Sequence, residues 1–480
     1  MNAITKEAYE LLHKGTLALA NAEQAGMRID LEYCERMKHR LSKKISMLEK
    51  EFKATKFYKH WAHVAKNPNI DSNFQLAHFL YNVKKLKPVR LTASGKGAVD
   101  EESLAQLNIP EVGLIVQMRK LRKIRDTYLD AFVREQVNGV IHPFYNLHTV
   151  RTFRSSSDRP NFQNIPKRDK EAMALCRKAI YPRPGHQLLE IDYAGIEVRI
   201  SQCYHKDPTM QKYIEDPHSD MHLDMAGQIF LLPDIDKSIP EHKVLRNAAK
   251  NGFVFPQFYG DYYANCAENM ACRWGGLPKG RWKHGQGITM PSGTLSDHLL
   301  ANGISSYEAF ENHVKEVEKD FWGRRFMVYQ QWKEKWWRRY QKNGYIDTLT
   351  GFRCIEPMRK NECLNTPIQG AAFHCLLWTF IEIDRIAREE NWDSRPVGQI
   401  HDAIVLDVAP TELDYVFETV RRVACEDIRK AWPWIIVPLD VEADICPVDG
   451  PWSEKETYQR KEEDGLEGEF DGERVDDLEG

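Results

Sequence analysis

Residues 188–200 read L-L-E-I-D-Y-A-G-I-E-V-R-I, an apolar run that meets the carboxylate of Asp192. The leucine and isoleucine residues predict a buried strand, and the segment after Gly195 predicts a helix. An aspartate that closes a strand is often only a turn or helix-capping residue. If it is neither, a charge at the end of a buried strand must be paired with an opposite charge or serve a function. Asp192 is therefore a candidate functional residue.

A second carboxylate, Asp402, lies far along the chain within P-V-G-Q-I-H-D-A-I-V-L-D-V at 396–408. Two short apolar runs flank His401 and Asp402, as in a β-hairpin whose tight turn carries the acid. If this hairpin pairs beside the first strand, Asp192 and Asp402 face one another. Two neighbouring carboxylates repel unless they share cations, and a pair of divalent ions bound in this way drives phosphoryl transfer.

The segments D-Y-A-G-I-E-V-R at 192–199 and Q-I-H-D-A-I-V at 399–405 resemble the first and third motifs of family A DNA polymerases, the bacterial polymerase I type. The resemblance spans roughly residues 17–450. It implies an α+β right-hand polymerase fold with an antiparallel palm sheet, helical fingers and a helical thumb. The implied function is template-directed DNA synthesis, in which deoxynucleoside triphosphates extend a primer on primer-template DNA.

The same resemblance makes Asp192 and Asp402 the catalytic residues. Together with the carbonyl of Tyr193 they are expected to bind two Mg²⁺ ions, for which Mn²⁺ can substitute. Ala403 stands where the third motif normally has a glutamate. Because both aspartates are present, we expect activity with an altered metal preference.

The resemblance also divides the chain. Residues 262–300 resemble no part of the family and are predicted to be an insertion in the fingers. No exonuclease domain fits before residue 17, so a separate exonuclease and accessory replication proteins are candidate partners. The compact form resembles phage-encoded members. The predicted parts are 1–145 (palm-entry segment and thumb), 146–210 (first part of the palm), 211–350 (fingers), 351–452 (second part of the palm) and 453–480 (acidic tail).

The net charge of −3 conceals an uneven distribution. From Ser453 to the C-terminus there are 12 acidic and 4 basic residues, a net of −8, which leaves about +5 for the rest of the chain. So acidic a tail is expected to be disordered. No segment resembles a signal peptide or a membrane span, so we expect a cytoplasmic protein, in a bacterial host if it is phage-encoded.

Residues of the predicted fingers resemble the nucleotide site of the family. Arg246 and Lys250 are four residues apart, hence on one helical face, where two cations repel unless an anion such as a triphosphate lies between them. The segment D-M-H at 220–222 resembles the family's D-I-H and assigns His222 to the triphosphate. The resemblance assigns Glu197 to the sugar, where it would exclude ribonucleotides, and Tyr259 to the template.

One residue more than usual separates Lys250 from Tyr259, in the segment K-N-G-F-V-F-P-Q-F-Y. Gly252 and Pro256 are poor helix-interior residues, so we expect a bulge or kink that absorbs the extra residue. Stacking on a base requires a ring, which favours Phe255 as the residue that faces the incoming base. The alternatives that stay open are Phe253 and Val254.

Several polar residues resemble the DNA contacts of the family. R-S-S-S-D-R-P-N-F-Q-N at 154–164 resembles a segment that touches the minor groove, where donors can test base-pair geometry without reading sequence. N-T-P-I-Q at 365–369 resembles a segment that touches primer and template. The DNA contacts implied are Arg154, Gln163, Asn164, Arg199, Asn365, Gln369 and His401.

Two further patterns have alternative interpretations. The basic run at 119–125 suits duplex-phosphate contacts or a solvated helix face. Aromatic residues at 321–345 suit single-strand stacking or, because they recur at helical spacing, a core stripe, which is favoured. The ten cysteines show no disulfide framework, and Cys266, Cys272 and His284 match no common zinc spacing.

Two other functions share part of this pattern. A single-subunit RNA polymerase has the same palm and both aspartates, but a glutamate at position 197 argues against ribonucleotides. A catalytically silent protein that binds primed DNA would not require the two aspartates or the Arg246–Lys250 pair.

Overall fold

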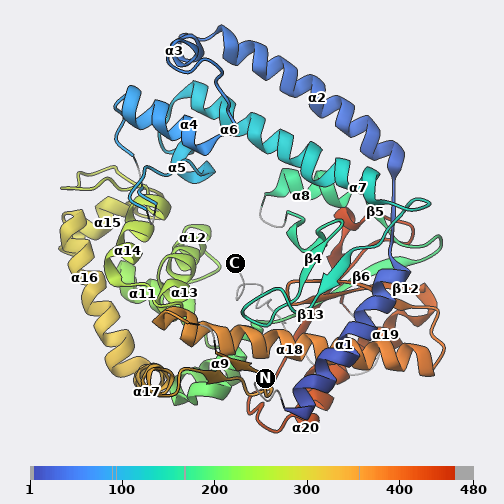
Figure 1. The fold of residues 1–480 in the computed structure, drawn as a ribbon. Coiled ribbons are helices and arrows are strands. Elements are labelled where there is room, and N and C mark those ends of the chain that lie inside the picture. Colours follow the sequence, from blue (N-terminus) through green and yellow to red (C-terminus); the bar gives the residue numbers. More distant parts are fainter. Residues whose placement is uncertain (1–4, 89, 93, 167–168, 356, 460–480) are drawn as a thin grey trace.

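The computed structural model describes residues 5–88, 90–92, 94–166, 169–355 and 357–459. It consists of helices and antiparallel sheets, so the predicted α+β class is confirmed. Figure 1 shows three lobes that follow one another around a ring. We name them the arm (31–135, top), the helical lobe (208–343, left) and the sheet lobe (6–29, 140–205 and 346–457, lower right).

A five-stranded antiparallel sheet organises the sheet lobe, in the order β11-β12-β6-β13-β14. Strand β6 is central, and β12 pairs with it from Ala403 opposite Asp192 to Val408 opposite Gln187. Strands β11 and β12 form the hairpin that the sequence predicts, and it pairs beside the first strand. The strands are β6 (Gln187–Tyr193), β11 (Arg395–Ile400), β12 (Ala403–Val408), β13 (Val441–Ile445) and β14 (Glu456–Thr457).

Strand β6 is covered on both faces because its side chains alternate between two cores. Leu189 and Ile191 pack in the core that includes residues of the long helix α18 (Lys360–Glu389), while Leu188 packs in a second core. The Tyr193 hydroxyl lies 2.8 Å from the hydroxyl of Thr379 on α18. Strand and helix are therefore fixed to one another directly behind Asp192.

Two positive φ angles shape the chain beside the predicted acids. Gly195, with φ of +58°, joins β6 to α9 (Ile196–His205), and a left-handed conformation there suits glycine. His401, with φ of +51°, occupies the tight turn between β11 and β12. Both turns bring the strand ends to one edge of the sheet.

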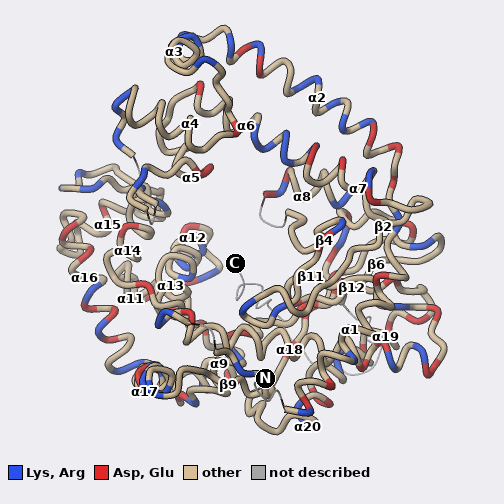
Figure 2. The backbone as a smooth tube through the Cα atoms, in the orientation of Figure 1, with Lys and Arg blue, Asp and Glu red and all other residues tan. Residues whose placement is uncertain are grey.

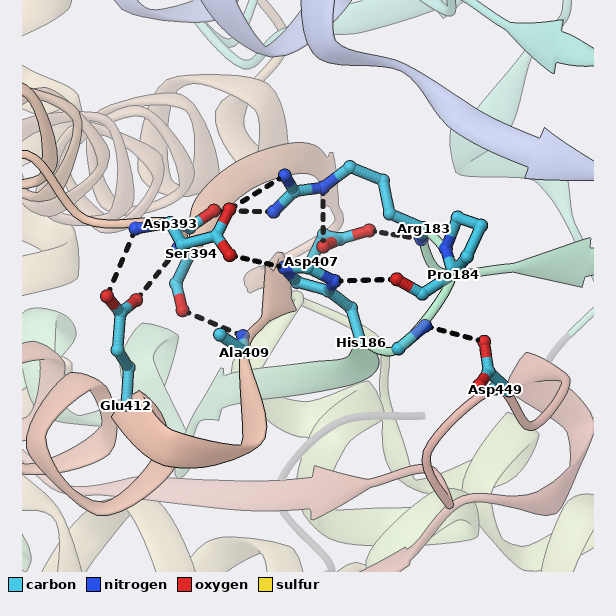
Figure 3. Close-up of polar contacts among 10 residues, drawn as sticks. Arg183, Pro184, His186, Asp393, Ser394, Asp407, Ala409, Glu412 and Asp449 are labelled. Atoms are coloured by element: carbon cyan, nitrogen blue, oxygen red, sulfur yellow. Dashed lines mark hydrogen bonds and ion pairs between the residues drawn. The ribbon is translucent and has the colours of Figure 1, made fainter.

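The opposite end of β6 and β12 is closed by a polar network, drawn in Figure 3. Asp407 accepts hydrogen bonds from the Nε and the backbone N–H of Arg183, at 3.0 and 2.7 Å. The same guanidinium donates to Asp393, at 3.0 Å, and His186 lies 3.3 Å from the other oxygen of Asp393. Glu412 accepts the backbone N–H groups of Asp393 and Ser394, so Asp407, Asp393 and Glu412 all have partners within the protein.

The arm is a helical unit in which several cations of the basic run at 119–125 have acidic partners within the protein. Lys120 lies 2.7 Å from Asp169, and Arg122 pairs with Glu49. Figure 2 shows basic and acidic residues interspersed along α2 and α6. Arg122 therefore holds parts of the arm together, whereas Lys120 ties the arm to the sheet lobe. The arm contains α2 (Leu31–Ala54), α3 (Lys56–Val64), α4 (Asn73–Ala77), η1 (His78–Val83), α5 (Glu101–Ala105), α6 (Pro110–Arg122), η2 (Lys123–Leu129) and α7 (Asp130–Glu135).

The helical lobe packs around its own apolar core. Phe326 and Tyr329 are buried in it, which confirms the core interpretation for the start of the aromatic stripe. The lobe contains α10 (Pro208–Glu215), α11 (Met221–Phe230), α12 (Pro240–Ala249), η4 (Lys250–Val254), α13 (Phe255–Phe258), α14 (Tyr263–Glu268), η5 (Asn269–Trp274), β7 (Thr289–Met290), β8 (Gly293–Thr294), α15 (Leu295–Ala301), α16 (Tyr307–Asp320), η6 (Phe321–Arg325) and α17 (Met327–Asn343).

The remaining elements complete the sheet lobe. They are α1 (Lys6–Ala25), β1 (Met27–Ile29), β2 (Val140–Ile141), β3 (Phe144–Asn146), β4 (Ser156–Asp158), η3 (Phe162–Asn164), α8 (Lys170–Arg177), β5 (Ile180–Tyr181), β9 (Ile346–Asp347), β10 (Arg353–Cys354), η7 (Pro410–Glu412), α19 (Leu413–Arg422), η8 (Val423–Asp427), α20 (Ile428–Ala431) and η9 (Trp452–Glu454).

The boundary predicted for the acidic tail is wrong at its start. Glu456 and Thr457 form β14, which pairs with Asp444 and Ile445 of β13, so the palm-like sheet continues past Ser453. The rest of the predicted tail, from residue 460, lies outside the described residues. Among the helices of the described part, none combines the length and the apolar character that crossing a membrane requires.

Candidate active site

Two predicted acids meet at one edge of the five-stranded sheet. Asp192 lies opposite Ala403 in the register of β6 and β12, and the backbone N–H of Tyr193 donates to the carbonyl of Asp402 at 3.3 Å. Asp402 is only 4% exposed. Its buried Oδ1 receives no hydrogen bond from the described residues, and the nearest cation recorded for it is Arg154, at 3.9 Å.

Arg154 and Glu197 lie beside this pair and interact with one another. The guanidinium of Arg154 forms an ion pair with one oxygen of Glu197, and the Tyr259 hydroxyl donates to the other. Burial raises the pKa of the Glu197 carboxyl, while Arg154 and Tyr259 act in the opposite direction. Three residues that the sequence assigned separately to sugar, template and DNA therefore form one cluster.

A polar network supports the turn that carries Asp402. Gln163 donates to the side-chain oxygens of both Ser155 (2.7 Å) and Gln399 (2.6 Å). Gln399 in turn donates to the carbonyl of His401. The sequence pointed to Gln163 and His401 but missed the role of Gln399, although it stands in the same motif. Gln163 is thus a support for the turn as well as a candidate DNA contact.

The extra residue of the helical lobe is absorbed as predicted. Helix α12 passes into the π-helical turn η4 (Lys250–Val254) and then into α13. A π turn takes in one residue more than an α turn. It thereby places Phe255 on the same face as Lys250, whose Nζ lies 5.5 Å from the centre of the Phe255 ring.

The structure separates the three candidates for the residue that faces the incoming base. Phe253 and Val254 are fully buried in the core of the helical lobe. Phe255 lines a pocket and lies with its ring 5.6 Å from that of His222, edge to face. Of the three residues, Phe255 alone is presented to the predicted nucleotide site.

Arg246, one of the residues predicted to bind the triphosphate, has a partner within the protein that the sequence did not reveal. The Nε of Arg246 donates to Asp220 at 2.7 Å. The other carboxylate oxygen of Asp220 accepts the backbone N–H of Leu223 and caps α11, the helix that carries His222. Asp220 therefore holds Arg246 and the start of α11 together, and it relieves part of the repulsion between Arg246 and Lys250.

The pocket that Phe255 lines is also lined by four other predicted residues. These five residues come from three segments that are distant in sequence. The pocket lies between α9, α13 and α18, with Tyr329 of α17 at its back. The predicted residues among its lining are Glu197, Phe255, Tyr259, Asn365 and Gln369.

The remaining candidates for DNA contacts differ in exposure. Asn164 and His401 are exposed beside the site. Arg199 is buried, and its guanidinium donates to the carbonyls of Ala194 (2.8 Å) and Pro438 (2.7 Å). Arg199 therefore does not lie on an exposed face, as a DNA contact would require, because it ties the start of α9 to the chain before β13.

The described residues contain no group of three or more His, Cys, Asp or Glu side chains arranged to hold a metal ion. Asp192 and Asp402 instead offer hard oxygen donors at the same end of the paired strands β6 and β12. Mg²⁺ characteristically uses one or two protein carboxylates and takes its other ligands from water and substrate phosphates. The donor set at Asp192 and Asp402 fits such an ion.

The comparisons with known proteins identify relatives over most of the chain. The model of DNA polymerase family A matches residues 31–274 and 297–450. The break in this match falls within the insertion predicted at 262–300. DNA polymerase I of Pseudomonas aeruginosa is 26% identical over 447 residues, which cover 89% of this chain and 42% of that protein. The thermostable DNA polymerase I of Thermus filiformis is 27% identical over 445 residues, covering 89% and 46%.

The fold is shared with solved structures. One of them is described as the POL domain of Pol1 from M. smegmatis in complex with DNA primer-template and dNTP, and it matches with a TM-score of 0.68 and 23% identity. The match covers 92% of this chain and 70% of that one. The predicted polymerase fold is thereby confirmed. The chain spans less than half the length of the curated relatives named above.

Proposed function

Because the chain belongs to DNA polymerase family A, we propose that it is a template-directed DNA polymerase that adds deoxynucleotides to a primer 3′-hydroxyl. The observation that carries the proposal is the meeting of Asp192 and Asp402 at one sheet edge, where the buried Oδ1 of Asp402 receives no hydrogen bond from the described residues. A buried carboxylate oxygen without a donor is costly unless a cation binds to it.

Asp192, Asp402 and the carbonyl of Tyr193 would hold the divalent ions, Mg²⁺ or in its place Mn²⁺. When bound, such ions lower the pKa of the primer hydroxyl and neutralise charge on the reacting phosphate and the leaving pyrophosphate. Ala403, opposite Asp192, adds no carboxylate to this edge. The protein's own contribution is then to fix the two aspartates through the sheet register and the supported turn.

The helix containing the π turn binds the nucleotide. Arg246, Lys250 and His222 neutralise the phosphates, and the ring of Phe255 packs against the base. Asp220 orients Arg246 through the 2.7 Å hydrogen bond. Since preorganised cations act mainly by electrostatic stabilisation, their fixed positions matter more than their number.

Glu197 selects the sugar. It lies five residues after Asp192, is held on both sides by Arg154 and Tyr259, and lines the pocket next to Phe255. A ribose 2′-hydroxyl would collide with this fixed carboxylate, whereas deoxyribose would not. Tyr259 closes the pocket on the template side.

Primer-template DNA lies between the lobes, with the sheet lobe as palm, the helical lobe as fingers and the arm as thumb. Asn164, His401, Asn365 and Gln369 supply DNA contacts, together with Arg154 and Gln163. The M. smegmatis neighbour supports this arrangement, because it is described with DNA primer-template and dNTP. Accessory replication proteins, a separate exonuclease, a phage origin and a cytoplasmic location stay predictions from the sequence.

The test is extension of a labelled DNA primer with Mg²⁺ and one deoxynucleotide at a time on templates that differ in a single base. We expect incorporation that follows the template base and that is much slower with ribonucleotides. Primer-independent synthesis from ribonucleotides would support an RNA polymerase. Tight duplex binding without extension, across a range of metal and salt concentrations, would identify a silent DNA-binding protein.

A further inference from the structure

A buried glutamine stands behind the helix that carries Phe255. Gln257 is 1% exposed and belongs to α13. Its Nε2 donates to Oε1 of Glu318 at 2.6 Å, and its Oε1 accepts from the indole N–H of Trp322 at 2.7 Å. Glu318 lies on α16 and Trp322 on η6. The Gln257 side chain therefore ties α13 to two further elements of the helical lobe.

The two sides of this helix are set by the register of the π turn. Phe255 and Tyr259 are four residues apart on the side of the pocket, while Phe253 and Gln257 are four apart on the side of the core. Without the π turn, every residue after it would rotate by about 100° about the helix axis. Val254 would then take the direction that Phe255 has now.

Apolar packing alone distinguishes the two registers poorly. Residues 253–255 read Phe-Val-Phe, so a rotation exchanges one apolar residue for another in the core. Hydrogen bonds are directional, and a buried amide that loses its partners is left unsatisfied at a cost. Gln257 reaches both partners only in the observed register, so it is the residue that can decide between them.

A lysine stabilises the partners of Gln257 from behind. Lys333, itself buried, lies with its Nζ 3.6 Å from the centre of the Trp322 ring. Burial raises the pKa of the Glu318 carboxyl, which the Gln257 hydrogen bond and Lys333 counteract. The Trp322 indole and the Glu318 carboxylate, which form hydrogen bonds with Gln257, are therefore themselves held in place.

We propose that Gln257, through Glu318 and Trp322, is a positioning residue that fixes the register of the π turn and thereby presents Phe255 to the incoming nucleotide. The word nucleotide rests on the proposed function, whereas the register itself does not. Gln257 touches no reacting group in this account, and its effect passes through Phe255 and Lys250.

The test exchanges the side chains of Gln257 and Glu318. Gln257→Glu places two carboxylates in contact and should raise the KM for deoxynucleotides about tenfold with a smaller change in kcat. The double variant Gln257→Glu/Glu318→Gln restores an amide opposite a carboxylate and should return the KM to within about twofold of wild type. Glu318→Gln alone keeps an acceptor for Gln257 and should resemble wild type.

Hydrogen exchange of the protein without DNA supplies the second readout. Gln257→Glu should speed exchange of the amides at 250–259 and leave those of the five-stranded sheet unchanged, and the double variant should restore protection. The matched control is Gln228→Glu. Gln228 lies in the same lobe, on α11, and donates to Asp320 at 3.3 Å rather than to Glu318 or Trp322, so its variant should leave both readouts unchanged.

An unchanged KM and unchanged exchange in Gln257→Glu would overturn the proposal. So would a double variant that remains as impaired as the single one, because general damage to the core is not repaired by the exchange. If the wild type fails to extend primers, the proposed function fails, and the exchange measurement still decides whether Gln257 fixes the π turn.

Discussion

The paired strands β6 and β12 have carboxylates at both ends of the pair, and the two ends are built differently. Asp192 and Asp402 lie at one end, which we call the open end, and Asp407 lies at the other, which we call the closed end. At the closed end Asp407 accepts two hydrogen bonds from Arg183, at 3.0 and 2.7 Å. At the open end, the Oδ1 of Asp402 receives none from the described residues, and Arg154, 3.9 Å away, is already paired with Glu197. A carboxylate saturated by donors holds the fold together. One left with a bare buried oxygen costs stability and is available to a ligand.

The largest expected effect is at the open end. Asp192→Ala should lower the rate of nucleotide incorporation at least about a thousandfold, equivalent to about 4 kcal/mol of barrier, because a proposed ligand of the catalytic ions is lost. Single-turnover extension with saturating nucleotide measures this rate. The urea midpoint should stay the same or rise, since repulsion between the two acids is removed. Extension at a wild-type rate would show that this edge is not the catalytic centre.

The closed end should show the opposite pattern. Asp407→Asn should lower the free energy of unfolding by about 2 kcal/mol, because the hydrogen bonds to Arg183 lose their charge. The incorporation rate of the folded variant should stay close to wild type. Urea unfolding and single-turnover extension of the same preparation test both parts. A large loss of rate without a loss of stability would erase the distinction between the two ends.

A smaller effect is expected at Glu197, beside the open end. Glu197→Ala should reduce the preference for deoxy- over ribonucleotides by about tenfold to a hundredfold, since the obstacle to a 2′-hydroxyl is removed. The measurement is the ratio of kcat/KM for matched deoxy- and ribonucleotides. Unchanged sugar selectivity would assign this discrimination to another residue.

The smallest expected effect is on the free energy of unfolding at low pH. The hydrogen bond from Arg183 is the main cause of the lowered pKa of Asp393. Asp393 therefore stabilises the fold above its unfolded pKa of about 3.9, and this contribution is lost as the pH falls through the lower folded value. Because its side chain is 61% exposed, solvent screening limits the effect to a few tenths of a kcal/mol.

Urea midpoints of wild type and Asp393→Asn test this as the pH is lowered. Their difference should be constant near neutrality and should shrink below about pH 4. At the open end the sign is reversed: burial raises the pKa of Glu197, so proton uptake there in mild acid favours the folded state. A difference for Asp393→Asn that persists through the most acidic samples would contradict its assignment to the closed end.

Local patterns predicted parts of the fold, and the resemblance to family A DNA polymerases supplied most of the candidate site residues. The apolar runs around Asp192 and Asp402 were sufficient for the strand and the hairpin, because period and turn residues are properties of neighbouring positions. The sequence offered the pairing of the hairpin with the strand only as a condition, which the register of β6 and β12 fulfils. Gly252, Pro256 and the one-residue excess predicted the irregular helix, which is the π turn η4.

Partners distant in sequence were not predictable in the same way. A basic helix face does not reveal that Arg122 pairs with Glu49. Nor does the first motif reveal that the arginine that ends it, Arg199, is buried against backbone carbonyls. The same holds for Gln257 and Glu318, which only the packing of α13 on α16 brings together. The ring-stacking argument favoured Phe255 but left Phe253 and Val254 open, because the sequence does not show that those two residues are buried in the core of the helical lobe.

The most direct test of the central claim applies one substitution to both ends of the hairpin. Asp402→Asn and Asp407→Asn remove the same charge from the same pair of strands, and single-turnover incorporation and urea unfolding are measured for each. We predict that Asp402→Asn abolishes incorporation without loss of stability, while Asp407→Asn loses stability and keeps its rate. Near wild-type incorporation by Asp402→Asn would contradict the assignment of the open end as the catalytic centre.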